Sequence, residues 1–290
     1  MQLDPSAVEA RIGLVALGTV GSTNAEALER ARSERGSFWV TAEAQTKGRG
    51  RMGRSWNSPP GNLYASLLLR DPSVFERAPE LTFVAVLALR DAIVAEAAAL
   101  APQLTFKWPN DLLLAGEKCA GILIEGEVEV EVGTSVTVVI GIGVNCAHHP
   151  PTTSVSPLAG AGPWSVQPTP FGELAVLYPA TDLHAHGAAI TPQQLFTRLS
   201  ATMCARIAQW DSGSGFIAIL GDWLSSARGL GEEISVRQNG SERVGRFVGL
   251  DQSGRLVLEL AGGRMEKISA GDVFPFALRG GREIPSQRAT

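Results

Sequence analysis

The sequence is poor in cysteine, and its cysteines lie too far apart to suggest a cross-linked or metal-bound scaffold. The 290 residues include three, Cys119, Cys146 and Cys204, with no Cys-x-x-Cys pair. A disulfide framework uses an even number of cysteines, and a structural zinc site uses closely spaced ligands. We therefore expect reduced cysteines that serve packing, and no structural metal.

The sequence also lacks a long apolar run and a secretory leader. No stretch of about 18 apolar residues occurs, and no basic segment followed by an apolar one stands at the N-terminus. The formal net charge of -4 gives no support to broad binding of nucleic acid or of anionic membranes. We expect a soluble cytoplasmic protein, whose 290 residues have room for one large domain and a small second one.

Positive charge is concentrated in residues 45–56, the Gly/Arg loop, which read Gln-Thr-Lys-Gly-Arg-Gly-Arg-Met-Gly-Arg-Ser-Trp. Its three arginines stand between three glycines. Fixed charge is thus carried on a backbone that can adopt positive φ and approach a ligand closely. This pattern predicts a site that holds an anion.

Two phosphate-binding motifs match the loop in part, but neither is compatible with the residues after it. The glycines satisfy Gly-x-Gly-x-x-Gly, and residues 48–55 differ from a P-loop by Arg54 in place of lysine. Both motifs require a helix to begin at once. Pro59-Pro60-Gly61 comes next, which cannot start one. We therefore exclude the Rossmann and P-loop interpretations; a solvated basic loop or an RGG-like patch stays open as the alternative.

Hydrophobic periodicity predicts the elements on either side of the loop. Thr23 and Glu26 form a candidate capping box for a helix that ends at Gly36. Strands are expected at 38–42 and 63–69. The Gly/Arg loop then joins two buried strands.

A second polar cluster is predicted at a strand end. Pro109 indicates a turn that exposes Lys107, Asn110 and Asp111 together. A short hairpin turn then delivers Lys118 to the start of the next strand. A lysine in that position is also typical of a solvated flank, so this interpretation is kept beside the functional one.

The remaining periodicity predicts packing elements and a change of class near the C-terminus. Residues 81–100 indicate a buried helix, and 138–145 a buried strand whose glycines let a ligand or another backbone lie close. A capping box at 191–194 and the stripe at 216–224 indicate two amphipathic helices. Four or five short strands from 231 onward suggest a small barrel.

These segments, taken in order and spacing, resemble the biotin protein ligases. The resemblance rests on Ser22-Thr23-Asn24, the Gly/Arg loop, 107–111, 118–125 and 141–145. It covers residues 10–148 closely and the C-terminal part more weakly. It implies an α+β fold, with a mixed sheet flanked by helices as in the class II synthetase-like biotin and lipoate ligases, and an SH3-like C-terminal barrel.

The resemblance also implies a reaction. Such enzymes join biotin to ATP, form biotinyl-5'-AMP, and pass the biotinyl group to one lysine of a biotin carboxyl carrier protein. ATP and biotin are then substrates and Mg²⁺ the accompanying ion. Clustered cations are needed, because two anions must be brought together.

The same resemblance implies roles for individual residues in catalysis and in binding biotin and ATP. The catalytic candidates are Lys118, Arg49 and Arg51. The biotin-binding candidates are Ser22, Thr23, Asn24, Gln45, Arg49, Gly50, Arg51 and Lys118. The ATP-side candidates are Arg54, Trp56, Lys107, Asn110, Asp111 and Asn145.

The sequence departs from the family pattern after Asn145. A Pro/Gly-rich stretch at about 150–178 predicts an insertion in a catalytic domain spanning 1–228; residues 229–279 would form the SH3-like domain and 280–290 a disordered tail. The insertion leaves the adenine side of the site undefined. Histidines that flank it are more typical of a surface than of a metal site.

Alternatives of two classes remain beside biotin ligation. A lipoate ligase or lipoyl/octanoyl transferase would share the catalytic fold. A non-enzymatic biotin-sensing regulator would need a DNA-binding unit, for which the roughly ten residues before the first predicted strand are too few. We therefore expect no repressor activity and no nucleic-acid partner, with a monomer or homodimer as the assembly.

Overall fold

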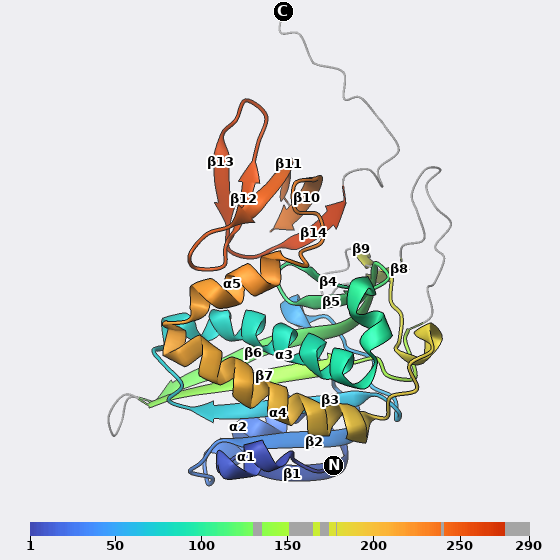
Figure 1. The fold of residues 1–290 in the computed structure, drawn as a ribbon, viewed down its shortest axis with the longest axis vertical. Coiled ribbons are helices and arrows are strands. Elements are labelled where there is room, and N and C mark those ends of the chain that lie inside the picture. Colours follow the sequence, from blue (N-terminus) through green and yellow to red (C-terminus); the bar gives the residue numbers. More distant parts are fainter. Residues whose placement is uncertain (130–134, 151–164, 169–173, 178, 239–240, 276–290) are drawn as a thin grey trace, which may run out of the picture.

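The computed structural model describes residues 1–129, 135–150, 165–168, 174–177, 179–238 and 241–275 (Figure 1). Its larger sheet has seven strands in the order β1-β2-β3-β7-β6-β5-β4. A second sheet has five strands, and β8 pairs with β9 separately. The larger sheet is mixed, because β1 runs parallel to β2 whereas the other neighbours are antiparallel.

The strands of the larger sheet are β1 Gly13–Val20, β2 Phe38–Gln45, β3 Leu63–Arg70, β4 Leu104–Lys107, β5 Asp111–Leu114, β6 Glu117–Glu129 and β7 Ser135–Val144. The helices are α1 Pro5–Glu9, α2 Thr23–Ala31, α3 Leu81–Glu96, α4 Pro192–Trp210 and α5 Phe216–Leu224. The remaining strands are β8 Ser165–Pro168, β9 Leu174–Leu177, β10 Glu233–Gln238, β11 Ser241–Leu250, β12 Leu256–Glu259, β13 Met265–Ile268 and β14 Asp272–Pro275. The predicted α+β class is confirmed.

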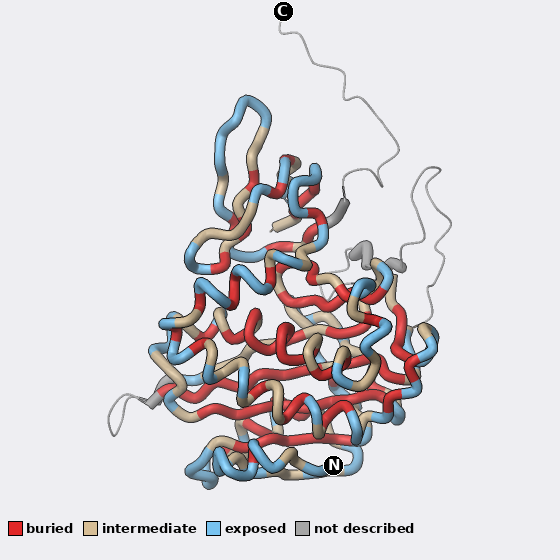
Figure 2. Tube along the Cα trace, viewed as in Figure 1, coloured by how far each residue is buried: buried red, intermediate tan, exposed pale blue. Residues whose placement is uncertain are grey.

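Helices cover both faces of the larger sheet, and they do so unequally. Helices α3, α4 and α5 lie on one face, and α2 lies on the other (Figure 1). Ala27 and Ala31 of α2 pack on Val40, Leu68 and Val139. Buried residues concentrate in the central strands and in α3 (Figure 2). The thin cover on the α2 face leaves that side of the strands available for a site.

The N-terminal end of α2 differs from the prediction by one residue. Ser22 is the N-cap residue, so Thr23 lies inside the helix and the predicted Thr23–Glu26 capping box does not form. Instead, Gln45 Oε1 accepts hydrogen bonds from the Thr23 amide at 2.8 Å and from its hydroxyl at 3.2 Å. A side chain from the end of β2 therefore caps this helix, which a local pattern does not reveal.

Two other helix ends differ in how well local signals predict them. Thr191 and Gln194 form the predicted capping box of α4, with proline at the first helical position. The apolar stretch at 81–100 gives a shorter helix than predicted, because α3 ends at Glu96 and a 3₁₀ turn containing Pro102 comes after it.

The C-terminal strands form an antiparallel sheet in the order β13-β12-β11-β10-β14. In the part of the chain that the structure describes, β13 and β14 are edges and do not pair, so the predicted barrel is an open sheet. Trp108 Nε1 donates to the carbonyl of Gly254 at 3.0 Å, and Phe247 and Leu258 belong to the same core cluster as α3. The two parts of the chain thus share one hydrophobic core.

Two predicted segments are covered only in part or not at all. Of the insertion at about 150–178, the structure describes residue 150 and the backbone of β8 and β9, which pair in antiparallel orientation. The predicted tail at 280–290 lies outside the described residues.

Candidate active site

A polar network surrounds the N-terminal end of α2, on the open face of the sheet. Ser66, fully buried in β3, donates to Asn24 Oδ1 at 2.6 Å, and its Oγ is hydrogen-bonded with Thr23 Oγ1 at 2.7 Å. Asn24 Nδ2 donates to Glu125 at 2.7 Å. Gln45 Nε2 donates to Ser58 Oγ at 3.0 Å. The structure thus brings together Thr23, Asn24 and Gln45, three of the predicted biotin-side residues.

Glycines of β6 and β7 leave space beside this network. Gly121 and Gly143 lie opposite each other, and Gly141 lies opposite Leu123. A Cβ atom on Gly141 would lie 2.3 Å from Asn24 Oδ1, and one on Gly143 would lie 2.7 Å from the Trp56 ring. Other groups do approach these glycines closely, but they are the side chains of Asn24 and Trp56 and not another backbone. A ligand contact there stays a prediction.

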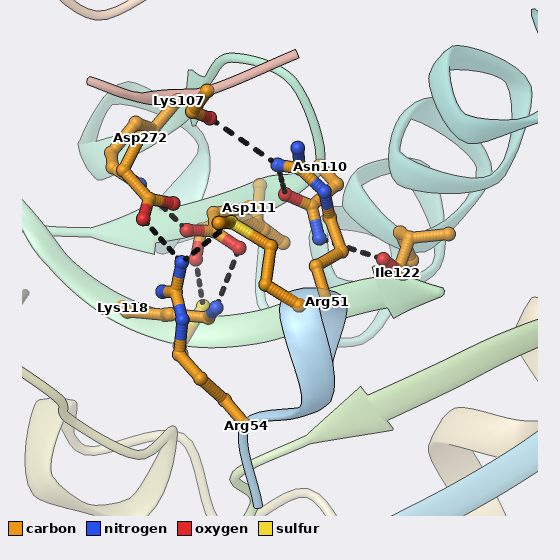
Figure 3. A network of polar contacts seen from close by, with 12 residues as sticks. Arg51, Arg54, Lys107, Asn110, Asp111, Lys118, Ile122 and Asp272 are labelled. Atoms are coloured by element: carbon orange, nitrogen blue, oxygen red, sulfur yellow. Dashed lines mark hydrogen bonds and ion pairs between the residues drawn. The ribbon is translucent and has the colours of Figure 1, made fainter. Parts of the chain in front are cut away.

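A cationic cluster lies beside the glycines, at the ends of β4, β5 and β6 (Figure 3). Asp111, buried at the start of β5, accepts from Lys107 Nζ at 2.8 Å and from Lys118 Nζ at 2.6 Å. Lys118 Nζ also lies 5.3 Å from the centroid of the Trp56 ring. Lys118 is therefore held inside the site, and the solvated-flank interpretation is wrong.

Burial and neighbouring charge shift the ionisation of this cluster. Burial favours the neutral acid, but the positive charges of Lys107 and Lys118 outweigh it, and the pKa of Asp111 lies well below its usual range. Burial lowers the pKa of the Lys118 ammonium, and Asp111 opposes that change. The cluster of Lys107, Asp111 and Lys118 carries a net positive charge, so it attracts an additional anion.

The Gly/Arg loop crosses the site and divides its arginines between two sides. Arg49 Nη2 lies 3.0 Å from both carboxylate oxygens of Glu125, on the α2 side. Arg51 Nη1 donates to Asn110 Oδ1 at 3.1 Å, and Arg54 pairs with Asp272 of β14 (Figure 3). Burial lowers the pKa of the Arg51 guanidinium.

The backbone of the loop explains why no helix-borne phosphate motif applies. Only a 3₁₀ turn, Arg51–Gly53, forms in the loop, and an extended segment comes after it. Gly53 has a φ of 72°, and a Cβ atom on Gly48 would lie 2.5 Å from the carbonyl oxygen of Trp56. Gly50 has neither constraint, since its φ is -109° and a Cβ atom would meet only ordinary contacts.

Asn145, an ATP-side candidate, follows β7 but its side chain turns to a different partner. Its Nδ2 donates to the carbonyl of Thr181 at 3.0 Å. The neighbouring backbone also runs along Lys118, whose amide donates to the carbonyl of Pro179 at 2.7 Å. Asn145 thus holds the segment 179–181, which is hydrogen-bonded to the backbone of Lys118. A contact of the Asn145 side chain with ATP stays a prediction.

Residues 19–145 match the model of the biotin/lipoate A/B protein ligase family, and residues 229–274 match the biotin protein ligase C terminal domain. The chain is also 41% identical over 258 residues to the biotin--[acetyl-CoA-carboxylase] ligase of Paracoccus denitrificans, covering 89% of this chain and 98% of that one. The chain belongs to the biotin protein ligase family. A second family member, the biotin--[acetyl-CoA-carboxylase] ligase of Mycobacterium tuberculosis, is 32% identical over 87% of this chain and 85% of that one.

Solved structures of the family share the fold of this biotin protein ligase family member. The Aquifex aeolicus biotin protein ligase in complex with biotin and ATP matches with a TM-score of 0.68 at 24% identity, covering 90% of this chain and 97% of that one. At that identity the likeness concerns the fold alone.

Several residues of this family member's site, Ser66, Glu125 and Asp272, were not predicted from the sequence. Ser66 could have been found, because it is the one serine inside the otherwise largely apolar run Leu63–Leu69. Glu125 ends the segment 118–125, in which only Lys118 was predicted to have a role. Asp272 carries no local signal, since it reaches the loop only through the packing of the C-terminal sheet.

Proposed function

We propose that this chain is a biotin protein ligase that uses ATP to attach biotin to a lysine of a carboxylase, as the names of its relatives indicate. The observation that carries this is the position of Lys118. Its ammonium pairs with Asp111, which neighbours Asn110 and so the Arg51 contact, and it lies 5.3 Å from the centroid of the Trp56 ring, which rests on Gly143. We infer that an anionic group of either substrate can reach it.

The proposed reaction requires a cation close to both the biotin carboxylate and the α-phosphate of ATP. A carboxylate oxygen of biotin attacks the α-phosphorus of ATP, the bond to pyrophosphate breaks, and biotinyl-5'-AMP forms. The amine of the carrier lysine then attacks the acyl carbon, and AMP leaves. Both steps develop negative charge on oxygen, which preorganised cations stabilise.

Each side of the site suits one substrate. The α2 network, with Ser22, Thr23, Asn24 and Gln45, offers neutral donors and acceptors, which suit the uncharged ureido ring of biotin. Trp56, an ATP-side candidate, lies against Gly121 and Gly143 of the sheet, where it offers an apolar surface; its contact with ATP stays a prediction. Arg51, Arg54 and Lys107, with Asn110 and Asp111, would lie toward the phosphates of ATP, and Gly50 would let the loop backbone approach them.

Magnesium enters this proposal with ATP and not as a resident ion. Among the described residues there is no group of three or more histidine, cysteine, aspartate or glutamate residues that could hold a metal. Asp111 is engaged by two lysines and Asp272 by Arg54. Mg²⁺ commonly binds through substrate phosphates and few protein oxygens, so the ATP complex can bring it.

The remaining expectations belong to the same proposal. We infer a catalytic part of residues 1–228 and a C-terminal part from residue 229, which agrees with where the second family model begins. A biotin carboxyl carrier protein is the proposed acceptor. No described helix has the length and apolar character to cross a membrane. A cytoplasmic location, the absence of a nucleic-acid partner and a monomer or homodimer stay predictions.

The decisive experiment is pyrophosphate exchange into ATP, measured with biotin and separately with lipoate. We expect exchange that depends on biotin and saturates with it. Exchange with lipoate alone would replace this function by lipoate ligation. Absence of exchange with either substrate, while the protein still binds biotin, would favour a non-enzymatic biotin sensor.

A further inference from the structure

Glu125 is an acidic residue inside a site that must bind two anions, and the proposed chemistry does not use it. It lies on β6 in line with Gly121 and Leu123, since residues two apart share one face of a strand. Its carboxylate therefore faces the same side of the sheet as the α2 network. A negative charge there would repel the substrates unless it were committed to another group.

The structure shows two groups to which this carboxylate is committed. Arg49 Nη2 lies 3.0 Å from each of its oxygens, and Asn24 Nδ2 donates to it at 2.7 Å. The side chains of Arg49 and Glu125 are 46% and 29% exposed. A pair this open to solvent contributes little to stability, so its geometry calls for another reason.

The contacts of Asn24 show what Glu125 arranges on the α2 side. Asn24 Nδ2 donates to the Glu125 carboxylate at 2.7 Å, and the carbonyl of Leu123 lies 3.5 Å from the same nitrogen. The amide oxygen is thereby turned toward Ser66, which donates to it at 2.6 Å. One carboxylate thus sets which way the amide of Asn24 points.

The contacts of Arg49 show what Glu125 arranges in the Gly/Arg loop. In the part of the chain that the structure describes, the side-chain contacts of Arg49 run through Nη2. The guanidinium carries five N–H donors in a rigid fork, so donors on its other nitrogens stay available to a ligand. Glu125 neutralises the charge of Arg49 while fixing the direction of its fork.

We propose that Glu125 is a positioning residue for biotin: it aligns the Arg49 guanidinium and the Asn24 amide before biotin binds. This inference rests on the proposed ligase function. It assigns Arg49 to orienting biotin, and it leaves the neutralisation of charge to Lys118 and Arg51.

Three variants separate the two contacts. Glu125→Gln keeps an oxygen that accepts from Asn24 but loses the charge that holds Arg49, and Glu125→Ala loses both. Glu125→Asp keeps the charge on a shorter side chain. Glu127→Gln is the matched control, because Glu127 lies two residues farther along β6 and is exposed.

The readout is biotin-dependent pyrophosphate exchange, with the KM of each substrate measured separately. Glu125→Gln should raise the KM for biotin about tenfold, with kcat within about threefold and the KM for ATP within about twofold of the wild type. Glu125→Ala should raise the KM for biotin further, Glu125→Asp should recover part of the loss, and Glu127→Gln should match the wild type.

A double-mutant cycle tests the route through Arg49. In an Arg49→Gln background, Glu125→Gln should change the KM for biotin by less than about twofold. A full tenfold effect in that background, or an unchanged KM in Glu125→Gln alone, would overturn the proposal. If Glu125→Gln is poorly folded by circular dichroism, the partial recovery in Glu125→Asp decides instead. Wild-type protein without biotin-dependent exchange would refute the ligase function itself, a separate result.

Discussion

At the scale of single residues, the decisive arrangement is one carboxylate between two ammonium groups. Asp111 pairs with Lys107 and Lys118 and is buried. A buried charge costs several kcal/mol unless it is paired, and two cations around one anion leave the group with a net positive charge. This suits a site that receives phosphate and carboxylate groups. It also makes Asp111 a residue on which stability and function both depend.

Replacing Asp111 with asparagine should lower the free energy of unfolding by about 3 kcal/mol at neutral pH, because the buried Lys107 and the half-buried Lys118 would lose their shared partner. The folded-state pKa of Asp111 is depressed, so its contribution is present above the unfolded pKa of about 3.9 and is lost as pH falls below it. The difference between the wild type and Asp111→Asn should therefore stay constant from pH 7 to about 5 and shrink below about pH 4. Urea unfolding followed by circular dichroism measures it.

Asp211→Asn serves as the control for this prediction, since Asp211 is exposed at the C-terminal end of α4. It should change the unfolding midpoint little at any pH. A difference for Asp111→Asn that persisted unchanged at pH 3 would contradict the assigned charge state.

At the scale of elements, β7 contributes open space to the site, because two of its residues are glycines without side chains. Gly141 and Gly143 leave room on the sheet for Asn24 and Trp56, which come from α2 and from the Gly/Arg loop. The neighbouring strands are apolar and buried, so a sheet without these glycines would be closed by its own side chains. The site forms because the N-terminal end of α2 and the Gly/Arg loop can lie directly on the backbone of β7.

Gly141→Ala should raise the KM for biotin at least about tenfold, because the new methyl group would displace the buried amide of Asn24. Biotin-dependent pyrophosphate exchange measures this effect. Gly18→Ala is the matched control in a strand, since nothing lies within 4 Å of a Cβ atom at Gly18. Equal KM values for the two variants would show that Asn24 does not contact biotin.

At the scale of the whole molecule, the C-terminal sheet reaches into the site. Arg54 pairs with Asp272, and Arg51 Nη1 lies 3.5 Å from the carbonyl of Gly271, so the start of β14 holds the end of the Gly/Arg loop (Figure 3). The shared hydrophobic core makes this contact part of one body. The C-terminal part therefore helps set the conformation of the loop.

Asp272→Asn should raise the KM for ATP several-fold while leaving the KM for biotin within about twofold, because it frees Arg54 on the phosphate side only. The melting temperature should change little, since a partly exposed ion pair contributes about 1 kcal/mol or less. Steady-state exchange kinetics and thermal denaturation measure the two effects.

Glu259→Gln gives the comparison for this variant. It removes an arginine–carboxylate pair of the same C-terminal sheet, with Arg246, without touching the loop. Equal KM values for ATP in Glu259→Gln and Asp272→Asn would show that the interdomain contact does not position Arg54.

Features that depend on near neighbours in the chain could be predicted from the sequence. The strands on both sides of the Gly/Arg loop, the capping box at Thr191 and the extended path after Arg54 all result from local propensity, proline and hydrogen-bond capacity. The order and spacing of the motifs predicted that the site residues would cluster. They do so because the motifs lie at ends of strands and helices that one sheet brings together.

The groups that those residues contact could be learned only from the folded chain. Gln45 caps α2, Asp111 separates two lysines, and Glu125 holds Arg49 across 76 positions of the chain. The C-terminal strands form an open sheet, because β14 pairs antiparallel with β10 and, within the described residues, not with β13. Such contacts join side chains far apart in sequence, so their geometry is set by packing and register, which no local pattern encodes.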